Sequence, residues 1–215
     1  MRTRRDVAPH LRVTREPQRG RYDRATIDAI LDEALVSHLG FVDDDRPFVI
    51  PTLHARVADV VYVHGSAASR MLRGLAGGAP VCLTATIFDG LVLAKSVFNH
   101  SVDYRSVVVV GTATLVGDAE KRDALRALTE QLAPGRWDEA RQPTAQELKA
   151  TWILSLPLDD ASAKVRSGPP EDEPEDESLP VWSGVVPVHL AAEPSEYDWR
   201  RVRDGRVGPP RTRDV

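Results

Sequence analysis

Long apolar runs and cysteines are both scarce in this sequence, and each absence excludes a class of protein. No window of the 215 residues approaches the roughly 18 consecutive apolar residues that a membrane-spanning helix requires. The single cysteine, Cys82, excludes an intrachain disulfide and a zinc site built from several cysteines. Its apolar neighbours predict a buried, unreactive thiol. With 6% aromatic residues and a formal charge of −4, the chain suits one soluble domain or slightly more.

The basic N-terminus resembles the start of a secretory or twin-arginine signal, because it opens with Met-Arg-Thr-Arg-Arg. The apolar segment that such a signal needs is missing, and four unsuitable residues stand in its place: Asp6, Pro9, His10 and Arg12. We therefore expect a cytoplasmic protein. Residues 1–24 carry eight arginines against three acidic residues, which would suit a contact with nucleic acid. Since the rest of the chain is acidic and repels phosphate, we expect a solvated arm, mobile or packed on a neighbouring subunit, and no nucleic-acid partner.

Shifts in composition divide the chain into five parts. Residues 168–177 contain six acidic residues and three prolines, so they cannot bury a core and form a loop. From residue 193 onward the sequence is again polar and rich in arginine, glycine and proline. The expected parts are a basic arm (1–22), a folded domain (23–166), an acidic proline-rich loop (167–180), a segment that packs on the domain (181–192) and a disordered tail (193–215).

Apolar periodicity predicts a mainly β domain with peripheral helices. Expected strands cover 38–42, 48–57, 60–64, 80–87, 91–95, 104–116 and, as the last one, 152–158. The Asp-Gly of Phe88-Asp-Gly90 favours a hairpin turn between the fourth and fifth strands. Expected helices cover 26–35, 66–75 and 118–132, and a further one opens at the capping box Thr144-Ala-Gln-Glu147. Short strands joined by hairpins argue for an antiparallel barrel.

Three segments in order carry a resemblance to a known family: Pro47–Thr52, Tyr62–Arg70 and Ser101–Gly111. Together they resemble the FMN-binding split-barrel superfamily of pyridoxamine 5'-phosphate oxidase, and most closely its nitroimidazole-resistance (Nim-type) branch. Pro134-Gly135, Arg141-Gln-Pro-Thr144, Leu154-Ser-Leu156 and Ser162-Ala-Lys164 add to the likeness. The resemblance implies a six-stranded antiparallel split barrel that forms a homodimer, with one FMN in each of two grooves between the subunits. The arginine-rich substrate signature of the vitamin B6 oxidases is absent, so that reaction is not expected.

An FMN phosphate needs exposed hydrogen-bond donors and a fixed cation. Gly65 and Ser66 lead into an expected helix, Ser69 adds a second hydroxyl, and Arg70 offers a planar pair of donors. We interpret these residues as a phosphate cradle. The alternative is that Ser66 only caps the helix while Arg70 faces water.

The resemblance places two further segments against the flavin ring. Pro51, Thr52, Leu53 and His54 would form an interrupted strand edge whose backbone groups bond the ring, unless they form only a strand kink. Tyr104, Arg105 and Ser106 would lie near the flavin or the partner subunit. Arg105 either stabilises negative charge on the reduced ring or pairs with an acidic residue across the interface.

His64 stands where the Nim-type pattern has a histidine beside the flavin, so it is the candidate catalytic proton donor. The alternative is a histidine that only bonds the phosphate or the backbone. Trp182 would fold over the cofactor or merely pack on the surface. A metal site built from His54, His64 and His100 is not expected, because no helical spacing presents them together.

Two functions follow from the resemblance. The first is an FMN-dependent oxidoreductase that passes electrons or hydride to a small oxidised organic molecule, with nitro-aromatic compounds among the candidates. The second is a stress-related module that binds flavin, deazaflavin F420 or haem with little turnover, since one fold supports several chemistries.

Overall fold

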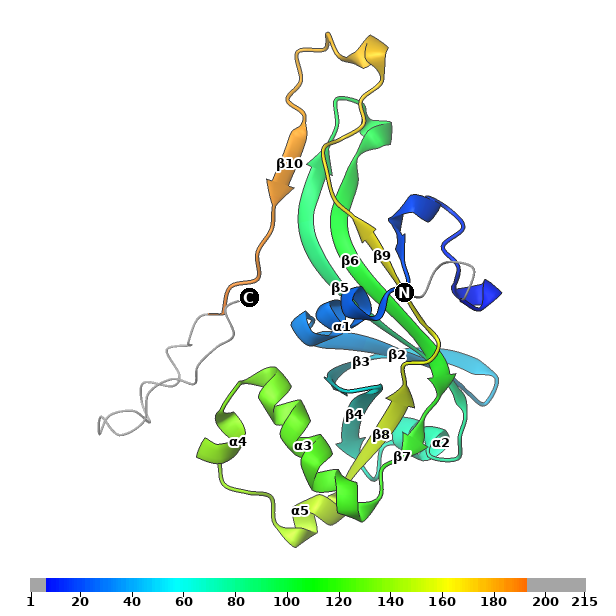
Figure 1. Ribbon diagram of the computed structural model, residues 1–215, viewed down its shortest axis with the longest axis vertical. Coiled ribbons are helices and arrows are strands. Elements are labelled where there is room, and N and C mark those ends of the chain that lie inside the picture. Colours follow the sequence, from blue (N-terminus) through cyan, green and yellow to red (C-terminus); the bar gives the residue numbers. More distant parts are fainter. Residues whose placement is uncertain (1–6, 193–215) are drawn as a thin grey trace, which may run out of the picture.

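The computed structural model describes residues 7–192, which build one antiparallel sheet of ten strands with a few helices at its periphery (Figure 1). The strands are β1 (Gly20–Arg21), β2 (Val36–Asp43), β3 (Arg46–Val57), β4 (Val60–Ser66), β5 (Pro80–Leu93), β6 (Ser101–Thr112), β7 (Thr114–Leu115), β8 (Thr151–Pro157), β9 (Ala161–Arg166) and β10 (Gly184–Pro187). The helices are α1 (Arg24–Glu33), α2 (Arg70–Leu75), α3 (Asp118–Leu132), α4 (Arg136–Glu139) and α5 (Ala145–Ala150). Short 3-10 turns cover Pro9–Leu11, Pro17–Arg19, Val97–Asn99 and Pro174–Asp176. The mainly β class is confirmed, and the sheet contains ten strands where the resemblance implies a barrel of six.

The sheet turns back on itself at β3, which pairs with a different neighbour at each end. From Arg46 to Leu53 it pairs with β2, and from His54 to Val57 it pairs with β4. The strand order is therefore β1-β9-β6-β5-β2-β3-β4-β8-β7, with β10 added to β5. Apolar side chains from both halves of the sheet meet in one core, which α1 and α2 complete with Ile30, Leu31, Leu72 and Leu75. Burial of this core holds the two halves of the sheet together.

A second core lies between α3 and the outer face of β3 and β4. Side chains alternate between the faces of a strand, so Val61 and Val63 point into the barrel while Tyr62 points toward α3. Ala124 and Leu128 of α3 pack against Tyr62 there. Helix α3 thus covers the outer face of the sheet over β3, β4 and β8.

Gln131 of α3 caps the C-terminal end of α1. Its side-chain Nε2 donates to the carbonyl oxygens of Asp32 at 2.9 Å and of Leu31 and Ala34 at 3.3 Å. Gln131→Leu leaves these buried carbonyls without that donor, so we expect the free energy of unfolding to fall by about 1–3 kcal/mol. Urea titration measures this, with the exposed Gln146→Leu on α5 as a control that changes stability by less than about 0.5 kcal/mol. Equal midpoints for the two variants would contradict the capping role.

The expected hairpin turn at Asp89-Gly90 is wrong, because β5 runs through it with only a bulge between Phe88 and Gly90. Close packing against β10 explains the glycine at position 90 instead. A Cβ at Gly90 would lie 3.0 Å from the carbonyl oxygen of Val186 on β10. The strand expected to be last, β8, is likewise followed by β9 and β10. In both places the strand forms because it pairs with a segment far away in the sequence. Local turn propensity does not depend on such pairing and therefore cannot predict it.

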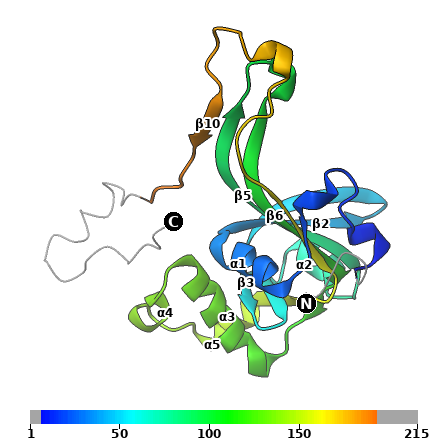
Figure 2. The ribbon, with the colours of Figure 1, turned by 45° about the horizontal axis from the view of Figure 1, so that its top comes forward.

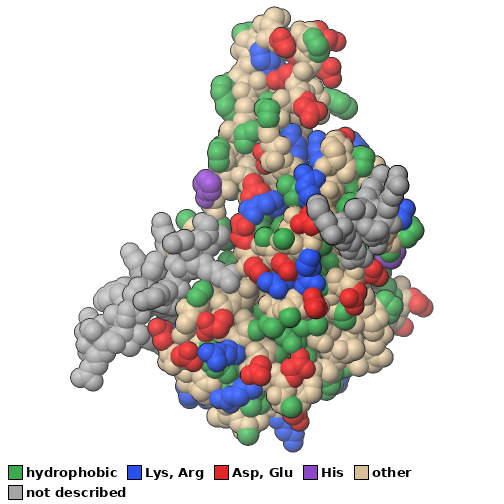
Figure 3. Space-filling model, viewed as in Figure 1, with side chains coloured by type: hydrophobic (Ala, Val, Ile, Leu, Met, Phe, Trp, Pro, Cys, Tyr) green, Lys and Arg blue, Asp and Glu red, His purple; other side chains and the backbone are tan. Residues whose placement is uncertain are grey.

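Residues 88–104 and 167–187 form a projection that we call the arm (Figures 1 and 2). Its two parts meet at Lys95, whose backbone N–H donates to Asp172 Oδ1 at 2.6 Å and whose ammonium donates to the carbonyls of Leu179, at 3.0 Å, and Glu177. Hydrophobic side chains follow the arm and acidic ones gather near its end (Figure 3). Val97 and Phe98 at the turn are 87% and 93% exposed. The acidic loop is therefore held against the rest of the arm.

Residues 7–22 pack on the barrel of their own chain. The sequence analysis instead expects this basic N-terminal segment to be solvated, either mobile or packed on a neighbouring subunit. Val7, Leu11 and Tyr22 form a small cluster against Val108 and Val110 of β6. Strand β1 pairs with β9. The arginines among residues 7–22 thus belong to a segment that is packed on the sheet.

Cys82 is exposed on β5, so the expectation of a buried thiol is wrong. Its neighbours Val81 and Leu83 face the core, and strand alternation turns Cys82 outward. Partial desolvation still raises the pKa of the Cys82 thiol, which keeps it protonated near neutral pH.

Among residues 7–192 no helix combines the length and apolar character needed to cross a bilayer.

Candidate functional site

Two open strand edges lie beside each other where β3 and β4 separate. Residues 46–53 of β3 pair with β2 alone, and His64, Gly65 and Ser66 of β4 pair with β8 alone. The two strands pair only between His54–Val57 and Val60–Val63, so they diverge beyond that point. Backbone N–H and C=O groups on such edges are free to bind a planar ligand with polar atoms on its rim.

The predicted ring-binding segment divides at this point. Pro51 is exposed and Thr52 and Leu53 are half-buried on the open edge of β3. His54 instead points into the core, where its Nε2–H donates to the carbonyl oxygen of Leu31 at 2.9 Å. His54 is therefore a core residue, and because its backbone pairs with Val63 of β4 it lies outside the open edge that Pro51, Thr52 and Leu53 form.

The predicted phosphate cradle lies where β4 leads into α2. Ser66 Oγ accepts from the backbone N–H of Ala68 at 3.1 Å, while the hydroxyl of Ser69, the N-cap of α2, makes no capping hydrogen bond. Arg70 lies 4.7 Å above the ring of Phe48 and forms an ion pair with Asp43, with 3.3 Å between Nε and Oδ2. Its side chain is 70% exposed, so the guanidinium remains accessible to an anion.

Gly65 is required by the packing beneath this turn. A Cβ there would lie 3.0 Å from Cδ1 of the fully buried Leu72 in α2. Glycine therefore lets α2 approach the end of β4 and sets the position of the residues around it.

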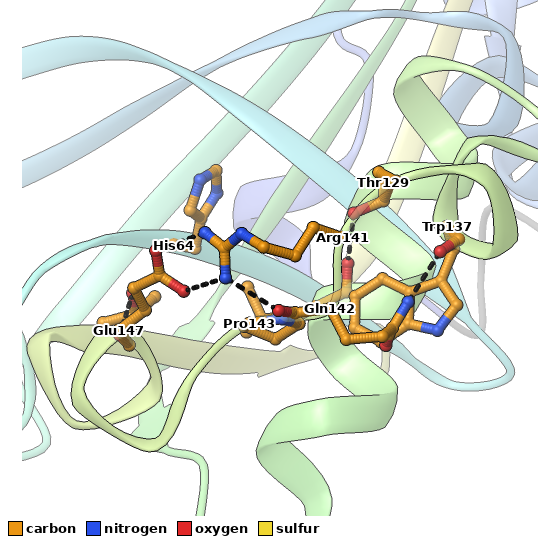
Figure 4. Close-up of a pocket in the computed structure, with 10 residues that line it drawn as sticks. His64, Thr129, Trp137, Arg141, Gln142, Pro143 and Glu147 are labelled. Atoms are coloured by element: carbon orange, nitrogen blue, oxygen red, sulfur yellow. Dashed lines mark hydrogen bonds and ion pairs between the residues drawn. The ribbon is translucent and has the colours of Figure 1, made fainter.

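The side chain of His64 leaves the open edge and enters a cavity of about 330 Å³ on the α3 side of β4 (Figure 4). It follows Tyr62 by two residues, so both point to this face. Leu125 and Thr129 of α3 form one wall, and the segment between α3 and α5 forms the other with Trp137, Ala140 and Pro143. The lining of the cavity thus combines apolar side chains with polar and charged ones.

His64 itself is half-buried, and its Nδ1 is buried without a hydrogen-bond partner among residues 7–192. Burial lowers the pKa of His64 below its ordinary value. A neutral imidazole is therefore favoured at neutral pH. It offers a lone pair to a metal or a donor more readily than it offers a proton.

Arg141 and Glu147 close one side of the cavity with an ion pair. Arg141 Nη2 and Nη1 donate to the two carboxylate oxygens of Glu147 at 2.7 and 3.1 Å. The pKa of Glu147 is lowered to about 2. The hydrogen bond from Arg141 is the largest cause, and the hydrogen bonds from Thr144 come next. Next to it, Gln142 donates to the carbonyl oxygen of Trp137 at 2.7 Å. Sequence reasoning gave these residues no role, although Arg141-Gln-Pro-Thr144 was part of the resemblance.

Arg105, the other predicted arginine, lies in a different place. Its guanidinium donates to Asp89 at 2.7 and 3.0 Å and to Glu33 at 2.6 Å. Both acidic partners belong to its own chain, whereas the sequence analysis predicts either an acidic partner across the interface or a contact with the reduced ring. Arg105 and its two acidic partners line a second cavity of about 420 Å³. His38 and His189 line the same cavity.

The remaining predicted residues do not join either cavity wall. Ser106 Oγ donates to the carbonyl oxygen of Lys164 at 3.2 Å, and Tyr104 lies opposite Arg166 in the sheet. Trp182 is 62% exposed on the arm, two residues before β10 begins. Across residues 7–192 no three His, Cys, Asp or Glu side chains converge as a metal cluster does.

Comparison with known proteins connects this geometry to a family. A family model described as pyridoxamine 5'-phosphate oxidase matches residues 23–165. No curated protein matches the chain. Three solved structures are similar. The flavocytochrome Anf3 from Azotobacter vinelandii shares 38% identity with a TM-score of 0.83, covering 97% of this chain and 92% of that one.

The FAD and haem binding protein from Mycobacterium smegmatis shares 36% identity with a TM-score of 0.81, covering 89% of this chain and 94% of that one. A candidate 5-nitroimidazole antibiotic resistance protein from Bacteroides thetaiotaomicron shares 21% identity with a TM-score of 0.59, covering 68% and 86%. The last shares the fold. With two thirds of its length matched by the family model, the chain belongs to the pyridoxamine 5'-phosphate oxidase family.

Proposed function

We propose that this protein is a flavin-dependent redox protein whose flavin lies along the open edges of β3 and β4. The divergence of these two strands carries the proposal, because it leaves free backbone groups beside the exposed Arg70. The FAD named for the mycobacterial relative supports a flavin. FMN, which the resemblance predicts, shares the isoalloxazine ring and the first phosphate with FAD, and the experiment below compares the two.

Different groups of the chain would hold the phosphate and the ring of the flavin. Arg70 would pair with the phosphate, and the hydroxyls of Ser66 and Ser69 would donate to it. Backbone groups of Thr52 and Leu53 would bond the polar rim of the ring and fix its orientation. The flavin supplies the electron or hydride transfer. As in the predicted homodimer, a second copy would close the groove from the other side.

A haem is the second redox group that we propose. The relative at 38% identity is called a flavocytochrome and the one at 36% identity is named for FAD and haem. When bound, a haem would supply a second electron-transfer group beside the flavin, and a small oxidised organic molecule such as a nitro-aromatic compound would be the electron acceptor. A binding module with little turnover is the competing function, and steady-state assays with nicotinamide donors separate the two.

Replacing Arg70 tests the flavin site. Arg70→Ala removes a charge-assisted contact to phosphate, so we expect the dissociation constants for FMN and FAD to rise about 10- to 100-fold. Flavin fluorescence titration of the flavin-free protein measures both constants. Arg46→Ala is the matched control, since Arg46 is an exposed arginine at the start of β3. If Arg70→Ala binds both flavins as tightly as the unmodified protein, the phosphate assignment fails.

A further inference from the structure

The side chain of Arg70 reaches from one open edge to the other. Its backbone begins α2 shortly after β4 ends at Ser66, while its guanidinium carbon lies 4.7 Å from the centre of the Phe48 ring on β3. Phe48 belongs to the part of β3 that pairs with β2 alone, and Ser66 belongs to the part of β4 that pairs with β8 alone. The contact between Arg70 and Phe48 therefore connects the two strands beyond the point where they diverge.

The ring of Phe48 is itself held in place by the core. Phe41 of β2 lies directly opposite Phe48 in the sheet, and the two rings stack with 5.6 Å between their centroids and an angle of 21° between their planes. Phe41 is only 6% exposed and belongs to the main core, against which Phe48 packs. Phe48 thus offers Arg70 an aromatic surface whose position the barrel determines.

The ion pair with Asp43 leaves the outer end of the guanidinium open. Asp43 Oδ2 lies 3.3 Å from Nε of Arg70, so the carboxylate is close to the inner nitrogen of the group. Nη1 and Nη2 make no hydrogen bond to any side chain or backbone group of residues 7–192, and the Arg70 side chain is 70% exposed. A planar pair of N–H groups is the geometry that grips two oxygens of a phosphate.

An exposed arginine normally samples many rotamers, and a ligand that needs one of them must restrict the rest at a cost in affinity. Attraction between a cation and the face of an aromatic ring lowers that cost before the ligand arrives. We propose that Phe48 is a positioning residue, which holds Arg70 between the open edges of β3 and β4 so that its Nη groups meet the flavin phosphate. This inference rests on the proposed function. Phe48 acts through Arg70 and not through the flavin ring.

The test titrates the full-length, flavin-free protein with FMN and with riboflavin, which has the same ring but no phosphate. For Phe48→Leu we expect the dissociation constant for FMN to rise about 3- to 10-fold, while that for riboflavin stays within a factor of two. Phe48→Tyr keeps an aromatic face and should bind FMN within a factor of two of the unmodified protein. Phe98→Leu makes the same change at the exposed tip of the arm and should alter neither constant.

A double variant shows whether Phe48 acts through the arginine. Phe48→Leu/Arg70→Ala should bind FMN as weakly as Arg70→Ala alone, because the ring then has no guanidinium to hold. If the two single losses multiply in the double variant, Phe48 acts independently of Arg70 and the inference is overturned. Equal weakening of FMN and riboflavin in Phe48→Leu overturns it as well, because a positioned phosphate ligand affects FMN alone. In both cases the flavin site itself stands.

Nuclear magnetic resonance tests the contact without any ligand and on the unmodified protein. Protons above the face of an aromatic ring resonate upfield, so the side-chain signals of Arg70, assigned by their loss in Arg70→Ala, should be shifted upfield. They should return to ordinary positions in Phe48→Leu. Ordinary positions in the unmodified protein would overturn the positioning role and leave the proposed function intact. An unmodified protein that shows the shift but binds no flavin would instead overturn the proposed function, and this inference with it.

Discussion

Arg166→Leu is expected to lower the free energy of unfolding by about 3–5 kcal/mol, a large share of the stability of a domain of this size. Arg166 of β9 pairs with Asp103 of β6 at the base of the arm, and their side chains are only 7% and 10% exposed. Asp103 Oδ2 also accepts from the backbone N–H of Gly168 at 3.3 Å. Removing the arginine therefore leaves a buried carboxylate without its counter-charge, which low-dielectric surroundings penalise strongly.

Urea unfolding of three variants tests this explanation. The double variant Arg166→Leu/Asp103→Leu removes both charges, so it should regain most of the loss. Arg136→Leu, which breaks the exposed pair between Arg136 and Glu139 on α4, should change stability by less than about 1 kcal/mol. A double variant as unstable as the single Arg166→Leu would show that packing, and not the unpaired charge, accounts for the effect.

The free energy of unfolding is expected to fall as the pH drops from 7.5 to 5.5, with a contribution from His54 of up to about 1.4 kcal/mol per pH unit. Burial lowers the pKa of His54 below its ordinary 6.5. In the fold its Nε2–H donates to Leu31 and its Nδ1 is buried without a partner among residues 7–192, so a second proton would have no acceptor. The unfolded chain accepts that proton and the folded chain does not, and acid therefore favours unfolding.

His54→Gln isolates this contribution. Glutamine keeps a donor for the Leu31 carbonyl but does not titrate, so the pH slope should decrease in this variant. The exposed His38→Gln is the matched surface control for a histidine-to-glutamine change. His64 contributes with the same sign, since burial also lowers its pKa, and some slope should remain in His54→Gln. Melting curves at several pH values give the comparison, and identical slopes for His54→Gln and the unmodified protein would contradict it.

Local features of the chain could be predicted from the sequence because neighbouring residues decide them. The capping box Thr144–Glu147 and the Asp23 cap of α1 both form as their residue types indicate. The β-branched run 107–110 is a strand, and the ordered segments of the resemblance identified the family. The Asp-Gly pair at position 90 failed as a signal, because β10 approaches from nearly a hundred residues away.

The sequence by itself therefore determined the mainly β class and the family. Only the tertiary structure decided which of two histidines borders a cavity. His54 and His64 stand on adjoining strands, but the pairing register turns the first into the barrel and α3 leaves a cavity over the second. Alternation along a strand fixes which side chains share a face, whereas long-range packing decides which face becomes core.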